Sequence, residues 1–292
     1  MTTPFNFHVL GSGSRGNATV VSFHDRAGKT RHLLIDLGLG PRTTRNRSRD
    51  IGIDLDQIEA AILTHGDSDH CTATWRNTLL RSGMPVYVAQ PHVQDALRAG
   101  IPPANLKPMG GRIELASSLT IHRATAPHDR EGTIAFRLEH HAHPDGVRSL
   151  GWATDLGRFV PDVEELLRGC DVVAIESNYD RQMQEEADRP GFLKRRIMNG
   201  HGHLSNHEAH QAILRLAGTS TPSAIVLLHL SQQCNCPRML ADFWSEHTPE
   251  LAARLHITDQ RLPLGPIEVH PAGPPLGQSP PNPGPVAQTL WS

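Results

Sequence analysis

Short β-rich runs recur along most of the chain, and they constrain its fold more than any other feature. Gly, Pro, Asn and Asp, which end strands and form turns, lie between them. The runs are FHVL (7–10), ATVVSF (18–23), HLLIDL (32–37), AAILTH (60–65), PVYVA (85–89), SLTIHRATA (118–126), GTIAFRLEH (132–140), RSLGWATDL (148–156), DVVAIES (171–177) and AIVLLHL (224–230). So many strands do not suit a simple doubly wound sheet. We expect two sheets packed face to face with helices outside.

Helical patterns interrupt these runs at five places: 71–82, 91–99, 161–169, 205–217 and 237–255. The fourth has a clear start, because Ser205 can act as N-cap and Glu208 as its capping-box partner. Residues 271–292 contain seven prolines and three glycines, a composition that does not form a packed element. We therefore expect one domain over 1–270 and a disordered tail over 271–292.

Composition excludes several classes of protein. The 292 residues carry a formal charge of −2, which argues against a broadly basic nucleic-acid coat but leaves room for a local patch. The apolar runs are far shorter than the roughly 20 residues of a membrane helix, and a basic-then-apolar leader is missing. We expect a cytoplasmic protein with reduced thiols and no membrane partner. The sequence does not set its oligomeric state.

The segment GSGSRG (11–16) matches the spacing of a dinucleotide-binding loop, and Asp36 lies about 20 residues further on, as that motif requires. However, a helix must follow the third glycine to hold a pyrophosphate. Here NATVVSF follows instead, and its β-branched residues indicate a second strand. We interpret the segment as a glycine-rich hairpin loop near an active site.

The segment THGDSDH directly follows an apolar run, and it is the strongest chemical signal among 19 histidines. His65, Asp67, Asp69 and His70 fall within one tight loop, where their side chains can converge on a metal ion. A polar turn that caps a helix near Cys71 is the alternative, but it accounts for one aspartate and not for the set. Two ions would need further ligands from later strand ends.

Three later side chains meet that requirement: His128, Asp155 and His229. Each is a single polar group at the C-terminal end of an apolar run. Taken alone, each is typical of a loop or core residue. Their shared position makes them candidate ligands.

Other polar segments favour simpler interpretations. EHHAHPDG (139–146) lies between two strands and contains a turn signature, so we expect a hairpin loop. RTTRNRSR (42–49) is interpreted as a solvated helix face, whereas FLKRRI (192–197) slightly favours contact with a nucleic-acid backbone. Cys234 and Cys236 follow His229 closely, but we do not favour a thiolate ligand.

The chain resembles the metallo-β-lactamase superfamily, whose hallmark is H-x-H-x-D-H followed by a distant His, Asp and His. Within it, the chain is similar to the YycJ/WalJ-type nuclease branch. The resemblance runs from about residue 8 to 240 through GSGSRGN, LLIDLGL, LTHGDSDH, APHD, ATDLG, IESNYD, RPGFLKRRI, GHGHLSN and LLHLS. It implies an α/β fold, the four-layer αββα sandwich, with the site at one edge between the sheets.

The resemblance also implies a site with two divalent ions, Zn²⁺ or Mn²⁺ with iron as a further option. One ion would be held by His65, Asp67 and His128, and the other by Asp69, His70 and His229, with Asp155 between them. A hydroxide that bridges the two ions would attack phosphorus. Asp69 and His203 of GHGHLSN are the expected catalytic residues, His203 as a phosphate contact or proton donor.

Two residues depart from the family pattern: Asp67 replaces a histidine of the hallmark, and Tyr179 replaces a histidine usual in the branch. A carboxylate can still ligate, and its harder oxygen shifts the preference from zinc toward manganese or iron. Three aspartates and a hydroxide would balance two dications, so the site would be neutral where a histidine would leave it at +1.

Three functions remain open from the sequence. The first is a dinuclear phosphodiesterase or exonuclease that acts on DNA or RNA. The second is a hydrolase of a small ester, lactone or thioester on the same fold, because function belongs to the site and not to the fold. The third is a metal-depleted, non-enzymatic binding module.

Overall fold

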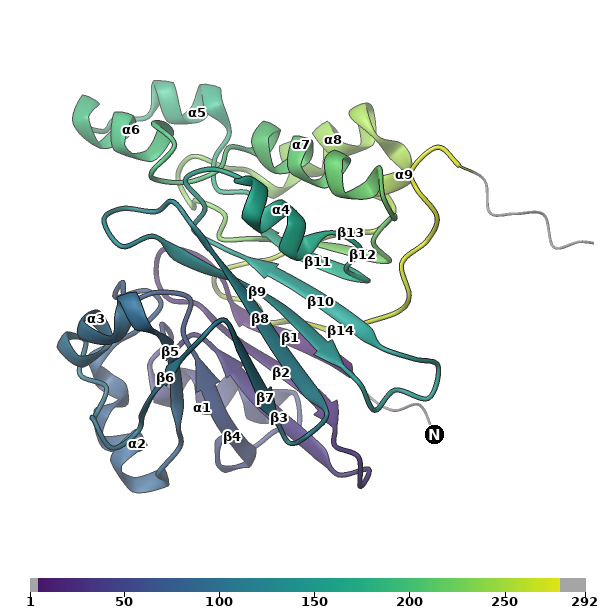
Figure 1. Ribbon diagram of the computed structural model, residues 1–292. Coiled ribbons are helices and arrows are strands. Elements are labelled where there is room, and N and C mark those ends of the chain that lie inside the picture. The colour runs from purple at the N-terminus through teal and green to yellow at the C-terminus, as the bar shows by residue number, and fades with distance from the viewer. Residues whose placement is uncertain (1–4, 279–292) are drawn as a thin grey trace, which may run out of the picture.

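Two mixed β-sheets pack face to face in the computed structural model, which describes residues 5–278 (Figure 1). The first sheet has the order β14-β1-β2-β3-β4-β5-β6. Its strands are β1 (Phe5–Gly11), β2 (Ala18–His24), β3 (Thr30–Ile35), β4 (Ile58–Ile62), β5 (Val86–Ala89), β6 (Leu106–Met109) and β14 (Leu264–Glu268). It is antiparallel from β14 to β3 and parallel from β3 to β6.

The second sheet repeats this division, with the order β13-β12-β11-β10-β9-β8-β7. Its strands are β7 (Arg112–Leu115), β8 (Leu119–Ala126), β9 (Thr133–His140), β10 (Arg148–Ala153), β11 (Val172–Glu176), β12 (Ala224–Leu228) and β13 (Leu255–Ile257). It is antiparallel from β7 to β10 and parallel from β10 to β13. The ten predicted runs all lie in these two sheets.

Successive residues of each strand point to opposite faces, and both faces are covered. In β3, Leu33 and Ile35 face the second sheet, while Leu34 packs under the helices of the first layer. In β12, Val226 joins the core between the sheets, whereas Ile225 and Leu227 pack outward. This explains why β12 is apolar at every position and why β11 is apolar up to its last residue.

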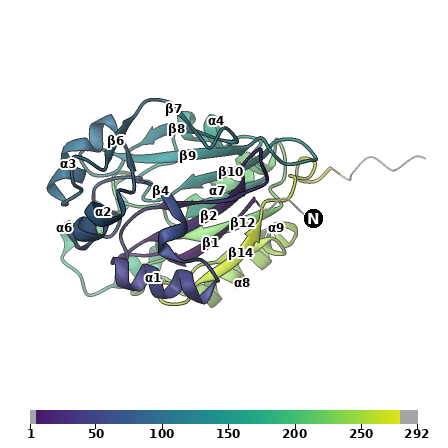
Figure 2. The same ribbon diagram turned by 90° about the horizontal axis from the view of Figure 1, so that it is seen from below.

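Helices cover both outer faces, which gives the predicted αββα order of layers (Figures 1 and 2). The first sheet is covered by α1 (Pro41–Asp50), α2 (Arg76–Ser82) and α3 (Val93–Arg98). The second is covered by α4 (Pro161–Leu167), α7 (Asn206–Ala217), α8 (Pro237–His247) and α9 (Pro249–Ala252). Helices α5 (Arg181–Glu186) and α6 (Gly191–Met198) project at one end of the molecule.

Several sequence predictions can be compared with these elements. The capping box of Ser205 and Glu208 begins α7 as predicted. The segment 42–49 lies in α1, and 141–147 forms the hairpin loop between β9 and β10. The five helical patterns omit α5 and α6.

The expected tail begins later than the composition suggests. The backbone N–H of Ala272 donates to Asp171 Oδ1 (2.9 Å), and that of Gly273 donates to the carbonyl of Thr221 (2.7 Å). Leu276 packs against the core under α7 and α8. Residues 271–278 therefore lie along the fold, because backbone hydrogen bonds and one leucine attach them, and the expectation of a disordered tail is corrected there. Residues 279–292 lie outside the described part.

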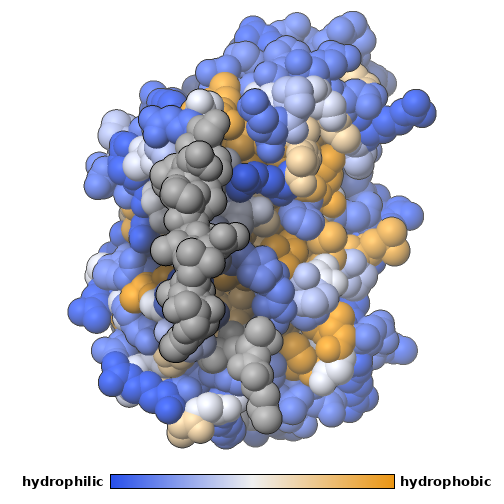
Figure 3. Space-filling model, turned by 90° about the vertical axis from the view of Figure 1, so that its right-hand side faces the viewer, coloured by the Kyte–Doolittle hydropathy of each residue, from blue (hydrophilic) through white to orange (hydrophobic). Residues whose placement is uncertain are grey.

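The surface carries few large apolar side chains. Those exposed in the described part are Leu80, Val147, Phe192, Met239 and Leu262. On the face shown in Figure 3, hydrophilic side chains surround small hydrophobic groups. Across residues 5–278, every helix is too short or too polar to span a bilayer.

Candidate metal centre

The loop after β4 carries four of the predicted ligands, and its backbone is tightly held. The N–H groups of His70 and Cys71 both donate to the carbonyl of Asp67 (2.8 and 2.7 Å), which closes a turn. The backbone N–H of Asn17 donates to the carbonyl of Asp69 (2.8 Å). Asn17 directly follows GSGSRG, so the glycine-rich segment supports the metal loop, in agreement with our interpretation of it as a loop near the site.

The remaining candidates converge on this loop from the second sheet. His128 follows β8, Asp155 follows β10 and His229 follows β12. These strands run parallel to one another, so their carboxyl ends meet at one edge. The structure brings all seven predicted ligands, with His203, to that edge.

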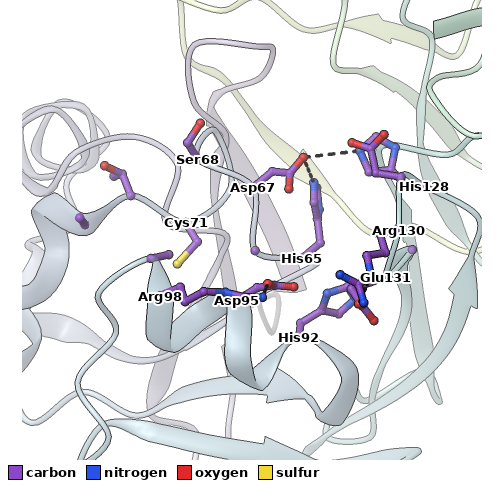
Figure 4. Close-up of a pocket in the computed structure, with 16 residues that line it drawn as sticks. His65, Asp67, Ser68, Cys71, His92, Asp95, Arg98, His128, Arg130 and Glu131 are labelled. Atoms are coloured by element: carbon purple, nitrogen blue, oxygen red, sulfur yellow. Dashed lines mark hydrogen bonds and ion pairs between the residues drawn. The ribbon is translucent and has the colours of Figure 1, made fainter. Parts of the chain in front are cut away.

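Potential donor atoms form four overlapping groups among the described residues. Two of these groups include acids that were not predicted as ligands: Asp155, Glu176, His203 and His229 in one, and Asp67, His128 and Asp129 in the other. The other two contain predicted ligands alone. His65, His128 and Asp155 offer ligand atoms within 4.8 Å of one another, and so do Asp69, His70 and His229. Asp67 Oδ2 lies 3.8 Å from His65 Nε2 and 3.9 Å from His128 Nε2, and Figure 4 shows it pointing toward both rings.

Asp155 reaches both of the groups that contain predicted ligands alone. Its Oδ2 lies 2.9 Å from His70 Nε2, and its Oδ1 lies 3.3 Å from His229 Nδ1. The carboxylate is buried, so it is well placed to be shared by two ions.

Each of three histidines is oriented by a bond to one ring nitrogen that leaves the other directed into the site. His128 Nδ1 lies 2.8 Å from the carbonyl of Gly202. His70 Nδ1 lies 2.8 Å from Asp36 Oδ2, and His65 Nδ1 lies 3.1 Å from the Thr64 hydroxyl. Such partners fix the tautomer and ring orientation of metal-ligating histidines.

The donor set fits divalent ions. Ligand atoms about 2.1 Å from one ion lie roughly 3.4 Å apart at tetrahedral angles, close to the 3.3 Å between His229 Nε2 and Asp69 Oδ2. His65 Nε2 is buried and has no hydrogen-bond partner among residues 5–278. Because a buried unpaired polar atom is costly, an ion is the partner that its position suggests.

Backbone strain concentrates at the same edge. Asp36, Asp155 and His229 have φ of 63°, 55° and 55°, and Asp129 has φ of 39°. Residues other than glycine rarely adopt such backbone conformations. The conformations persist where the surrounding structure and function require them. At this site, each strained residue ends a strand or follows one, and its side chain turns toward the donors.

Three acidic residues of the site were not among the predicted ones. Glu176 is fully buried at the end of β11, and its Oε1 lies 2.7 Å from His203 Nδ1 and 3.3 Å from His229 Nδ1. Asp36 orients His70, and Asp129 offers an oxygen near Asp67. An acid at the end of an apolar strand is a signal that would have identified Glu176 and Asp36.

Charges in the site shift the pKa values of its members. Burial would lower the pKa of His229, but Asp155, Asp69 and Glu176 raise it to about 10. For Asp155, burial is outweighed by His229 and His70, which lower its pKa well below the usual range.

Burial and nearby carboxylates also have opposite effects on the pKa of His203. Burial would lower its pKa, but the adjacent Glu176 carboxylate, followed by Asp155, raises it. His203 therefore holds a proton more firmly than an exposed histidine.

The two departures from the family pattern lie in different surroundings. Asp67 faces the donors with a side chain that is 51% exposed. Its pKa is raised above the usual value, chiefly because partial burial disfavours the charged carboxylate. Tyr179 is buried and lines a different pocket with Asp180 and Met198.

Two cavities adjoin the donors. One of about 620 Å³ extends from Asp67 and His128 past His92 toward Arg98 and Arg130 (Figure 4). The other, of about 320 Å³, lies in front of Asp155, His203 and His229. Proposed donors line both cavities.

Comparison with known proteins assigns this architecture to a family. Residues 31–230 match the family described as "Beta-lactamase superfamily domain". A protein named exodeoxyribonuclease YycJ from Bacillus anthracis is 26% identical over 268 residues, which cover 88% of this chain and 97% of the relative. A protein named exodeoxyribonuclease WalJ from Streptococcus pneumoniae is 27% identical over 243 residues, which cover 79% of this chain and 83% of the relative.

Among solved structures, zinc-bound PqqB from Methylobacterium extorquens has the same fold. Its TM-score is 0.60 at 18% sequence identity, and the match covers 89% of this chain and 99% of PqqB.

Proposed function

Because the chain belongs to the β-lactamase superfamily, we propose that it is a hydrolase with two divalent metal ions that cleaves phosphodiester bonds at the ends of nucleic-acid strands. The observation that carries this proposal is the position of Asp155, which belongs to one donor group with His65 and His128 and lies 2.9 Å from His70 of the other. Both groups contain a histidine that a second hydrogen bond orients. The two relatives named exodeoxyribonucleases support the choice of substrate.

The proposed ligands are His65, Asp67 and His128 for one ion and Asp69, His70 and His229 for the other, with Asp155 between them. When bound, two divalent ions would stabilise charge on the phosphoryl group and provide a nucleophile at neutral pH. The three aspartates make the donor set rich in oxygen, which favours Mn²⁺ over Zn²⁺ relative to a set with histidine at position 67.

His203 is the proposed proton donor to the leaving oxygen. Its Nδ1 is engaged by Glu176 Oε1 (2.7 Å), so its Nε2 is free to face substrate in the cavity that it lines. Glu176 is itself fixed by the N–H groups of Leu156 (2.8 Å) and Leu204 (3.1 Å). A fixed carboxylate that keeps the imidazole protonated is the arrangement that a general acid needs.

The exposure of the site favours a nucleic acid over a small ester. The Asp67 side chain is about half exposed, so the donors face an open surface. The larger adjoining cavity is lined by polar groups of both signs, and its two arginines, Arg98 and Arg130, are each paired with an acid. A small ester would be better held in a closed apolar pocket.

Cleavage of end-labelled DNA and RNA in the presence of Mn²⁺ or Zn²⁺ tests this proposal. We expect wild-type protein to release mononucleotides or short products from linear strands and to leave circular single strands intact. An Asp155→Ala variant is the control. If wild-type protein cleaves nothing beyond that control, the nuclease proposal is wrong.

A further inference from the structure

Helix α6 forms one wall of the smaller cavity in front of the donors. Leu193, Arg196 and Ile197 of this helix line the cavity, opposite the loop that carries Asp67. Of the described residues that line this cavity, Arg196 is the only one that is a lysine or an arginine. None of the side chains of α6 is buried, so the helix contributes to a surface more than to the core.

The guanidinium of Arg196 is held by a carboxylate outside the proposed ligand set. Its Nε lies 2.9 Å from Asp129 Oδ1, and its Nη2 pairs with Asp129 Oδ2. The Arg196 side chain is 59% exposed. Asp129, and more weakly Asp67, raise the pKa of Arg196. The guanidinium therefore lies close enough to the loop after β4 to interact electrostatically with Asp67.

The charge of the proposed site makes this cation significant. Asp67, Asp69, Asp155 and an anionic nucleophile would balance two dications, so the ions alone give an anionic substrate no net attraction. Arg196 provides positive charge beside Asp67, and a planar guanidinium matches phosphate as well as carboxylate.

Phe192 lies one turn from Arg196 on the same face of α6, because residues four apart are neighbours on a helix. Its side chain is 68% exposed, in a helix that is otherwise rich in basic residues. An exposed aromatic ring beside a cation is the combination by which single strands are bound, with the base stacked and the phosphate paired.

We propose that Arg196 exchanges Asp129 for a backbone phosphate of a single-stranded nucleic acid, and that Phe192 stacks on a neighbouring base. This inference rests on the proposed function and assigns the side of the site from which the strand enters. Asp129 then acts as a competitor that occupies the guanidinium until substrate arrives.

The decisive test compares Arg196→Gln with Asp129→Asn, because the two substitutions break the same ion pair. If the pair only attaches α6 to the loop after β8, both variants weaken binding alike. If Arg196 binds phosphate, Arg196→Gln weakens binding about tenfold, whereas Asp129→Asn tightens it by up to about fivefold. Affinity is measured by fluorescence anisotropy with a fluorescein-labelled phosphorothioate oligothymidylate, which resists cleavage.

Matched controls separate local from general effects. Arg195→Gln removes the same charge from the same helix but outside the cavity, and we expect a smaller loss. Arg196→Gln should also reduce the slope of log affinity against log salt by about 0.7, the value for one phosphate contact on a single strand. Phe192→Ala should weaken binding at least about fivefold, and Leu262→Ala, which shortens another exposed apolar side chain, should not.

The binding measurement is independent of hydrolysis, so its failure differs from failure of the proposed function. Opposite effects of the two variants support the inference even if wild-type protein cleaves nothing. Equal effects of the two variants, or no binding of the oligonucleotide by wild-type protein, overturn it.

Discussion

Asp67 is the residue at which this site departs most from its family, and the structure gives the substitution a clear position. Its carboxylate lies 3.8 Å from His65 Nε2 and 3.9 Å from His128 Nε2, where it could act as the third ligand of the proposed first ion. An oxygen donor there suits harder ions than an imidazole would. The departure therefore concerns the choice of metal and the charge of the site.

The Asp67→His variant tests this account. We expect it to tighten Zn²⁺ relative to Mn²⁺ by about tenfold or more, equivalent to about 1.4 kcal/mol, because imidazole is the softer ligand. Competition with a chelator measures both dissociation constants. An unchanged ratio of the two constants would show that residue 67 does not ligate.

His203 should act on the leaving group, whereas Glu176 also contacts the proposed ligand His229, whose Nδ1 lies 3.3 Å from Glu176 Oε1. We expect His203→Ala to lower kcat by about 10²- to 10⁴-fold on a dinucleotide, with metal content unchanged. The loss should be much smaller on a nitrophenyl ester of a nucleotide, whose leaving group needs no proton. Glu176→Gln should reduce kcat in the same substrate-dependent way.

A comparable loss on both substrates would argue against His203 as the proton donor.

The sequence identified the seven proposed ligands because each lies in the loop after β4 or at the end of a strand. Glu176 was missed although it ends β11 at the same edge where His229 follows β12. The difference is that a glutamate in IESNYD has no distinctive spacing, and its partners, His203 and His229, are distant in sequence. Only the folded chain brings them together.

At the scale of elements, β-rich runs and turn residues predicted ten of the fourteen strands in residues 5–278. The four that were missed, β6, β7, β13 and β14, are the edge strands of the two sheets. Helices α5 and α6 were not predicted, because α6 buries none of its side chains and so lacks a clear amphipathic pattern. The packing of loops around the site could also not be predicted from the sequence. It depends on close backbone approaches between segments far apart in the chain.

Gly38 shows how closely those loops pack. A Cβ at this position would overlap the carbonyl group of Asp69 and would approach the backbone nitrogen of Asn17 to 2.6 Å. We expect Gly38→Ala to displace the metal loop, with loss of bound metal and at least about tenfold lower activity, because small displacements of catalytic groups are costly.

Gly110→Ala is the matched control, since a Cβ there meets nothing within 4 Å. Metal content and kcat of both variants are the readouts. Normal metal content in Gly38→Ala would show that the loop tolerates movement.

At the scale of the molecule, the two sheets place polar residues from β4, β8, β10, β11 and β12 at one edge. The core between the sheets holds the strands in register, so the donors are set by the scaffold and not by a flexible loop. Helix α6 and the loop after β8 add the surface that faces substrate. The central claim is that this edge binds two divalent ions and is catalytic only with them.

Metal analysis of the purified protein tests that claim most directly. After dialysis against Mn²⁺ or Zn²⁺ and removal of free ions, elemental analysis should find about two equivalents of metal per folded chain, and at most one in Asp155→Ala. One equivalent or none in folded wild-type protein would contradict the two-ion site.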